Sequence, residues 1–218
     1  MADIETLDFS DQTLLADLLS AFRAVKVPGG DDQYLLERIE KWIAAHKIPH
    51  QVIFQKLVIH TAKNVEFACL LGIFYHYAIG TPQNPTKAFE MYKLASENND
   101  AFGQNQVGWC YIKAFGTDID FKLGFEWYQK SAAGGDHCGE CGVGYCYRMG
   151  CGTEIDIKKS LYWYRKSAFA GECTGEFGLA FFYRDGWGVP KDVHQAIKWY
   201  VKAKGCYSFW HLSQVMYP

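Results

Sequence analysis

The chain has 218 residues with 24 acidic and 22 basic side chains, and its formal charge of −2 argues against a surface that tracks nucleic-acid phosphates. Hydrophobic residues make up 49% of the chain, so a large core can form and general disorder is excluded. The longest apolar stretch, residues 67–75, is too short to span a bilayer, and no secretory signal is expected. Aromatic residues reach an unusual 17%, which needs a structural cause.

Residues 1–64 are expected to form an N-terminal helical cap region. Leucines and Phe22 at helical spacing predict an amphipathic helix from Asp11 to about Lys26, ended by a Pro-Gly-Gly sequence. Similar spacing predicts a second helix over residues 33–45. A third helix is expected to begin at Pro49 and to carry Val52, Ile53, Leu57 and Val58. These helices would cover an apolar face at the start of the next region.

A period of 36 residues follows, in four blocks that cover residues 65–100, 101–136, 137–172 and 173–208. The columns that keep this step are Gly72, Gly108, Gly144 and Ala180; Tyr75, Tyr111, Tyr147 and Tyr183; Gly80, Gly116, Gly152 and Gly188; and Tyr92, Tyr128, Tyr164 and Tyr200. A fifth column holds Trp127, Trp163 and Trp199, with Met91 as its early exception. Internal repetition of this kind predicts a solenoid, and it assigns most of the aromatic residues to packing between repeats.

Each block has the pattern of two helices joined by a tight loop. The first half is apolar at helical spacing and ends two residues before the glycine column that begins at Gly80, where a left-handed turn is expected. Short oxygen-bearing side chains then mark the start of the second helix as N-caps: Asn84, Asp120, Asp156 and Asp192. A two-helix unit cannot bury its apolar stripe alone, so the blocks must stack.

These motifs resemble the Sel1-like repeat, a tetratricopeptide-like family. The resemblance is carried by Leu71-Gly72, Tyr75, Gly80 and Lys87-Ala88 in the first block, and by the Trp-Tyr pairs that end at Tyr128, Tyr164 and Tyr200. The residue pattern of the blocks is most similar to that of fungal, HCP-like Sel1-repeat proteins. The resemblance implies an all-α fold, an α/α superhelical solenoid of stacked two-helix repeats, that acts as a non-enzymatic scaffold or adaptor for protein–protein interaction.

The last residues, 209–218, are expected to form a C-terminal capping helix or a truncated fifth repeat. Phe209, Trp210, Leu212 and Val215 make it too apolar for a finished polar cap. It is therefore expected to pack on the fourth repeat, and self-assembly through residues 209–217 is one alternative function.

The eight cysteines raise the alternatives of a metal site and of disulfides. Cys138, Cys141, Cys146 and Cys151, with His137 beside them, provide zinc-ligand types, which makes a zinc- or small-molecule-binding protein another alternative. Three of these cysteines fall on one helix, however, which favours buried small hydrophobic residues and no metal or cofactor. Secreted bacterial relatives pair cysteines between repeats, but the matching column here has none, so a reducing, cytoplasmic location without that framework is predicted.

A partner is expected to bind the concave face, which the first helices form in tetratricopeptide-like arrays. Three columns supply the predicted groove: Ile73, Trp109, Tyr145 and Phe181; His76, Ile112, Arg148 and Arg184; and Cys69, Asn105, Cys141 and Phe177. Aromatic side chains flanked by arginines and an asparagine suit a peptide with apolar anchors and an acidic group. The alternative is that these aromatics pack against neighbouring helices. No catalytic motif is present in the sequence, so no enzymatic activity is predicted.

Overall fold

The computed structural model describes residues 9–24 and 32–203, and all regular structure in those ranges is helical. An N-terminal group comprises α1 (Phe9–Ala24), α2 (Asp32–His46), α3 (His50–Thr61) and a short 3-10 helix (Val65–Phe67). The repeats follow as helix pairs: α4 (Ala68–His76) with α5 (Pro85–Glu97), α6 (Ala101–Lys113) with α7 (Phe121–Ala133), α8 (His137–Met149) with α9 (Ile157–Phe169), and α10 (Cys173–Asp185) with α11 (Val193–Lys202). The predicted all-α solenoid is confirmed.

The predicted N-caps of the second helices are present in every repeat. In each case the side-chain oxygen accepts a hydrogen bond of 2.9–3.0 Å from the backbone N–H three residues ahead; the capping residues are Asn84, Asp120, Asp156 and Asp192. The first helices have their own caps, which the sequence patterns did not single out: Asp100 accepts from Gly103 N–H at 2.7 Å, and Asp136 accepts from Cys138 N–H at 3.2 Å. The start of each of these helices is thereby fixed by a local hydrogen bond.

The loop glycines bring consecutive repeats into direct backbone contact. Gly116 has a φ of +71°, and a Cβ atom at this position would overlap the carbonyl oxygen of Pro85 at the start of α5. Gly152 meets Phe121 at the start of α7 in the same way. At Gly116 and Gly152 the column therefore provides both the left-handed turn and a close approach that fixes one repeat against the previous one. At Gly188 the nearest atoms are side-chain carbons 3.6 Å away.

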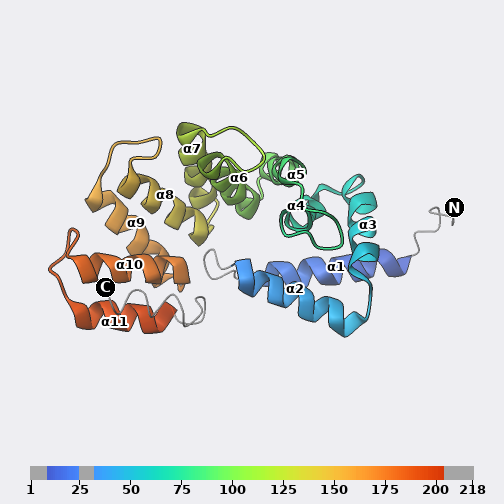
Figure 1. The fold of residues 1–218 in the computed structure, drawn as a ribbon, viewed down its shortest axis with the longest axis horizontal. Helices are drawn as coiled ribbons and strands as arrows, with labels where there is room; N and C mark the ends of the chain where they lie inside the picture. The colour runs from blue at the N-terminus through green and yellow to red at the C-terminus, as the bar shows by residue number, and fades with distance from the viewer. Residues whose placement is uncertain (1–8, 25–31, 204–218) are drawn as a thin grey trace.

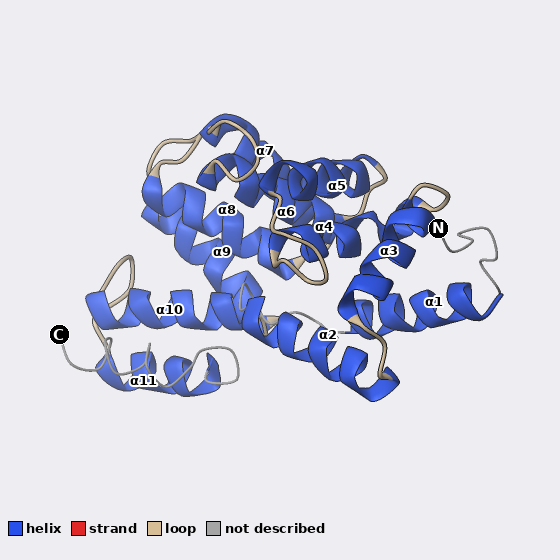
Figure 2. Cartoon of the chain, turned by 45° about the vertical axis from the view of Figure 1, so that its right-hand side comes forward, coloured by secondary structure: helices blue, strands red, loops and turns tan. Residues whose placement is uncertain are grey.

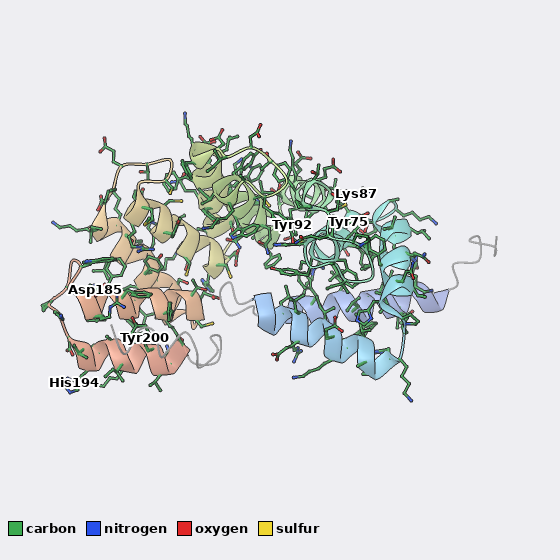
Figure 3. All side chains as sticks on the ribbon, in the orientation of Figure 1. Tyr75, Lys87, Tyr92, Asp185, His194 and Tyr200 are labelled. Carbon is green, nitrogen blue, oxygen red and sulfur yellow. The ribbon has the colours of Figure 1, made fainter. Side chains whose placement is uncertain are left out.

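The tyrosine column is the repeat core, as predicted. Tyr92, Tyr128, Tyr164 and Tyr200 are all buried. Each of the first three packs against the glycine of its own first helix, so that the two helices of a repeat lie close together. Figure 3 labels Tyr92 and Tyr200, which occupy equivalent places in the first and last repeats. The tryptophan column differs, because its members are only half-buried and carry a lysine ammonium over the ring, as Lys130 does over Trp127 at 3.9 Å.

The N-terminal helices cover the start of the solenoid. In α3, Ile53 and Leu57 are buried, whereas Val52 and Val58 are exposed, so only part of its expected apolar face is used. The backbone of His50 receives the loop glycine of the first repeat, which gives α3 the place of a preceding second helix. Helix α1 reaches further along the array, since its Phe22 ring meets Phe102 of α6 edge-on at 5.5 Å.

The solenoid bends into an arch, with α1 and α2 at one foot and α10 and α11 at the other (Figures 1 and 2). Helix α6 contacts α8, and α8 contacts α10, whereas successive second helices make far less contact. The first helices therefore form the tighter, inner side of the bend.

No helix in the described ranges is long and apolar enough to cross a bilayer. The predicted packing and self-assembly of residues 209–217 lie outside the described residues.

Candidate functional site

Three aromatic side chains line the inner side of the arch on successive first helices. Trp109 comes from α6, Tyr145 from α8 and Phe181 from α10, and each is partly exposed. Their spacing in the chain is one repeat, so the solenoid places them in a row. We call the surface that they line, together with the cavities described next, the inner groove.

Two cavities open along the inner groove. The first has a volume of about 200 Å³ and is lined by Asn105, Trp109, Ile112, Lys113, Tyr128, Cys138, Cys141, Gly142, Tyr145, Tyr164 and Thr174. The second has a volume of about 220 Å³ and is lined by Tyr145, Arg148, Tyr164, Thr174, Phe177, Gly178, Phe181 and Phe182. Tyr145, Tyr164 and Thr174 belong to both, so the two cavities adjoin each other. Their size suits single side chains of a bound peptide.

Two cations flank the aromatic wall between the cavities. The Lys113 ammonium lies 5.8 Å from the centre of the Tyr145 ring, and the Arg148 guanidinium lies 5.7 Å from the same ring and 5.8 Å from Trp187. Within the described part of the chain, neither cation forms an ion pair with a carboxylate. Both positive charges are therefore available to an acidic ligand.

Arg184 also faces the groove but is already paired. Its Nε and Nη2 atoms donate to the two carboxylate oxygens of Asp185, each at 2.7 Å, and its guanidinium lies 4.5 Å from the centre of the Phe181 ring. Asp185 stands at the end of α10 (Figure 3). The hydrogen bonds from Arg184 hold the pKa of Asp185 below its usual value. Arg184 is thus a weaker candidate for ligand binding than Arg148.

A buried carboxyl lies beside the first cavity. Glu172 caps α10 and interacts with Cys138, and burial is the main reason that its pKa rises to about 8. At neutral pH most of this carboxyl is protonated. It therefore adds little negative charge that would repel an acidic ligand.

The structure buries the three predicted groove residues of the first repeat and so removes them from the surface. Cys69 is buried in the N-terminal core. Ile73 is fully buried in the N-terminal core, and His76 lies beneath Tyr77, Trp109 and Phe115, whose ring centres are 4.1, 5.1 and 4.2 Å away. The physical reason is that the aromatic rings from repeats one and two close over this end. The packing alternative thus holds at the first repeat.

The other predicted positions lie in the groove itself. Asn105 lines the first cavity and is partly exposed, and Ile112, although buried, lines the same cavity. Phe177 lines the second cavity and contacts Phe181 edge-on at 4.9 Å. Lys113, Gly142 and Gly178 were missed by the column count. The two glycines could have been noticed in the sequence. They occupy the same column as Gln106 of the preceding repeat, so the residue there changes from a long side chain to none.

His76 predicts a loss of stability in acid. Burial lowers its pKa to about 4, whereas the unfolded chain takes up this proton near pH 6.5. Stability from the neutral ring is therefore complete above pH 6.5 and is lost as the pH falls toward 4. Between pH 7 and pH 5, the free energy of unfolding of wild type should fall by about 2 kcal/mol more than that of a His76→Leu variant. Urea unfolding at both pH values measures this; parallel changes in the two proteins would contradict it.

The cysteines do not converge on a metal site. In residues 9–24 and 32–203, no three His, Cys, Asp or Glu side chains meet as a metal ion requires, so the geometry lends the zinc alternative no support. Burial raises the pKa of the Cys138 and Cys141 thiols, and Cys141 Sγ lies 2.9 Å from Ser167 Oγ.

Cys173, in contrast, takes part in a disulfide whose other half lies outside the described residues. The sequence pattern excluded only the framework between repeats and did not predict a disulfide at this cysteine.

The sequence pattern of the Sel1 repeat matches residues 65–100, 101–136, 139–171 and 174–204, more than half of the chain. The chain belongs to the Sel1 repeat family. Sel1 repeat proteins generally mediate protein–protein interactions. No curated protein matches the sequence.

Solved structures of bacterial Sel1 repeat proteins share the fold. A Sel1 repeat protein from Oxalobacter formigenes superposes with a TM-score of 0.65 at 25% identity, over 70% of this chain and 61% of that one. The c5321 protective antigen of uropathogenic Escherichia coli, which has an SLR fold, superposes with a TM-score of 0.60 at 21% identity, over 90% of this chain and 48% of its own. This chain thus spans about half to three-fifths of these proteins. The closer likeness to fungal members stays a prediction.

Proposed function

We propose that this Sel1 repeat protein is a non-enzymatic adaptor that binds a segment of a partner protein in the inner groove. The observation that carries the proposal is the pair of adjoining cavities between Trp109 and Phe181, which are lined by partly exposed aromatic side chains. Aromatic side chains that stay accessible in a concave site are typical anchors of a protein interface.

The charges around the groove favour a partner segment that carries an acidic group. Lys113 and Arg148 lie over Tyr145 without a carboxylate partner in the described ranges, and Glu172 is largely protonated at neutral pH. An Arg guanidinium held against an aromatic ring is also well oriented to bind a carboxylate through two parallel hydrogen bonds. Apolar anchors beside an acidic group therefore describe the expected segment.

Selection of peptides from a random display library on the purified protein tests the proposal. We expect the selected peptides to bind wild type and to lose at least tenfold in affinity with the combined Trp109→Ala and Arg148→Ala variant, because both the apolar anchor site and the free charge are removed. Fluorescence anisotropy with labelled peptides measures the dissociation constants.

Two controls separate binding from folding. Tyr162 is 60% exposed on α9 and lines neither groove cavity, so Tyr162→Ala should leave peptide affinity unchanged. Trp109 also packs on His76 and Phe115, so Arg148→Ala alone serves as the variant that spares these contacts. Selected peptides that bind all variants with wild-type affinity would contradict the groove assignment.

A further inference from the structure

The two cavities of the inner groove are copies of one site, displaced by one repeat. Advancing the lining residues of the first cavity by 36 positions gives seven of the eight residues that line the second, including Tyr145 from Trp109, Tyr164 from Tyr128, and Gly178 from Gly142. Because the repeats stack regularly, equivalent residues build equivalent depressions. The groove is therefore a row of two subsites rather than one irregular hollow.

The absence of a side chain at one column opens each subsite. A Cβ atom at Gly142 would overlap the ring of Tyr128, and a Cβ atom at Gly178 would overlap the ring of Tyr164. One repeat earlier the same column holds Gln106, which is buried, and the neighbouring Phe102 is in contact with Phe22 of α1. The row thus begins at the second repeat.

The two subsites differ in chemistry at one decisive position. Ile112 lines the first subsite, and Arg148, one period later, lines the second. The Arg148 guanidinium rests on Tyr145 and Trp187 and has no carboxylate partner among the described residues. Lys113 also lines the first subsite, with its ammonium 5.8 Å from the centre of the Tyr145 ring. Ile112 and Trp109 suit an apolar side chain there, whereas Arg148 makes the second subsite suit a carboxylate.

The distance between the subsites selects a backbone conformation for the ligand. Packed helices lie about 8–10 Å apart, and α6, α8 and α10 contact one another in succession along the groove. A polyproline II segment rises about 3.1 Å per residue and returns to the same face every third residue, or about every 9 Å. An extended strand returns to the same face after about 7 Å or about 13 Å, which fits the spacing less well. Aromatic-lined grooves are also well suited to proline rings.

We propose that the inner groove binds a proline-rich segment in the polyproline II conformation, with an apolar residue at one position and a Glu or Asp three residues away. This inference rests on the proposed function, since it specifies the ligand of the same groove. The apolar residue enters the subsite of Trp109 and Ile112, and the acidic residue meets Arg148.

Synthetic peptides of otherwise all-proline sequence provide the test. One probe carries Leu and Glu three positions apart; the others place them two or four apart or replace Glu with Gln. We expect wild type to bind the three-residue spacing about tenfold more tightly than each of the other probes. With Arg148→Met, the Glu and Gln probes of three-residue spacing should bind with equal affinity. Among Gln peptides, this variant should still bind the three-residue spacing more tightly than the other spacings. The matched control Lys158→Met, on the exposed face of α9, should behave as wild type.

The outcomes separate this inference from the proposed function. Equal affinity for all spacings, or an undiminished preference for Glu in Arg148→Met, would overturn the two-subsite inference. If library-selected peptides still lose affinity with the Trp109 and Arg148 variants but carry neither the spacing nor the acidic residue, the adaptor function stands and the ligand class is wrong. If neither set of peptides responds to the groove variants, both proposals fail.

Discussion

Replacing Gly116 with alanine will lower the free energy of unfolding by about 3–5 kcal/mol. Two independent penalties combine at this residue. Its φ of +71° is costly for any residue with a Cβ atom, by about 1–2 kcal/mol, and the added Cβ would overlap the carbonyl oxygen of Pro85. Because that oxygen belongs to the backbone of α5, the overlap can be relieved only by moving one repeat relative to the next.

Gly135→Ala is the matched control for this prediction. Gly135 has a similar φ of +86°, but nothing lies within 4 Å of the position that its Cβ would occupy. It should therefore lose only the conformational part, about 1–2 kcal/mol. Urea unfolding followed by circular dichroism gives both values. Equal losses in the two variants would show that contact between repeats contributes nothing at Gly116.

The difference between these glycines illustrates how far the sequence predicts the fold. The 36-residue step alone locates the helix pairs, their N-caps and the buried tyrosines, because each repeat must satisfy the same packing and hydrogen-bonding requirements. It also places Gly116 in a turn column. Whether a turn glycine touches its neighbour depends on how the repeats stack, which sequence periodicity does not specify.

The inner groove shows where prediction from columns is incomplete. Trp109, Tyr145 and Phe181 occupy one column and do line the inner side, but Ile73 of the same column is buried. The column count treats all repeats as equivalent, whereas the N-terminal helices and the rings around His76 close the first one. Contacts between distant segments, such as that of α1 with α6, carry no periodic signal.

The two subsites also explain why repeats can vary without loss of the fold. Gln106, Gly142 and Gly178 occupy one column on the groove side. A side chain in this column would cover the tyrosine ring of the preceding repeat, so glycine is found where that ring lines a subsite. Ile112 and Arg148 occupy equivalent positions in successive repeats. The difference between them changes the charge of a subsite and leaves the helix intact. Departures from the repeat pattern on the inner face are therefore the residues most informative about a ligand.

Replacing Lys166 with alanine is the second large effect that we expect, a loss of about 3 kcal/mol in the free energy of unfolding. Glu140 has a side chain only 2% exposed, and the Lys166 ammonium contacts its carboxylate at 2.8 Å. Removing one member of such a pair leaves a buried charge without its main partner, which typically costs 3–5 kcal/mol. The lower end applies here, because Lys166 is 45% exposed and His137 still lies 3.0 Å from Glu140.

A double-mutant cycle gives this prediction its sharpest form. The equivalent of Glu140 in the preceding repeat is Gln104, which is buried without an ion pair, so Glu140→Gln should be tolerated. Adding Glu140→Gln to Lys166→Ala should then restore most of the lost stability, with a coupling energy of at least 1 kcal/mol. The exposed pair of Lys159 with Asp156, at 3.5 Å, is the control, and Lys159→Ala should cost less than 1 kcal/mol. Additive losses at Glu140 and Lys166 would mean that the buried charge is stabilised by something other than this lysine.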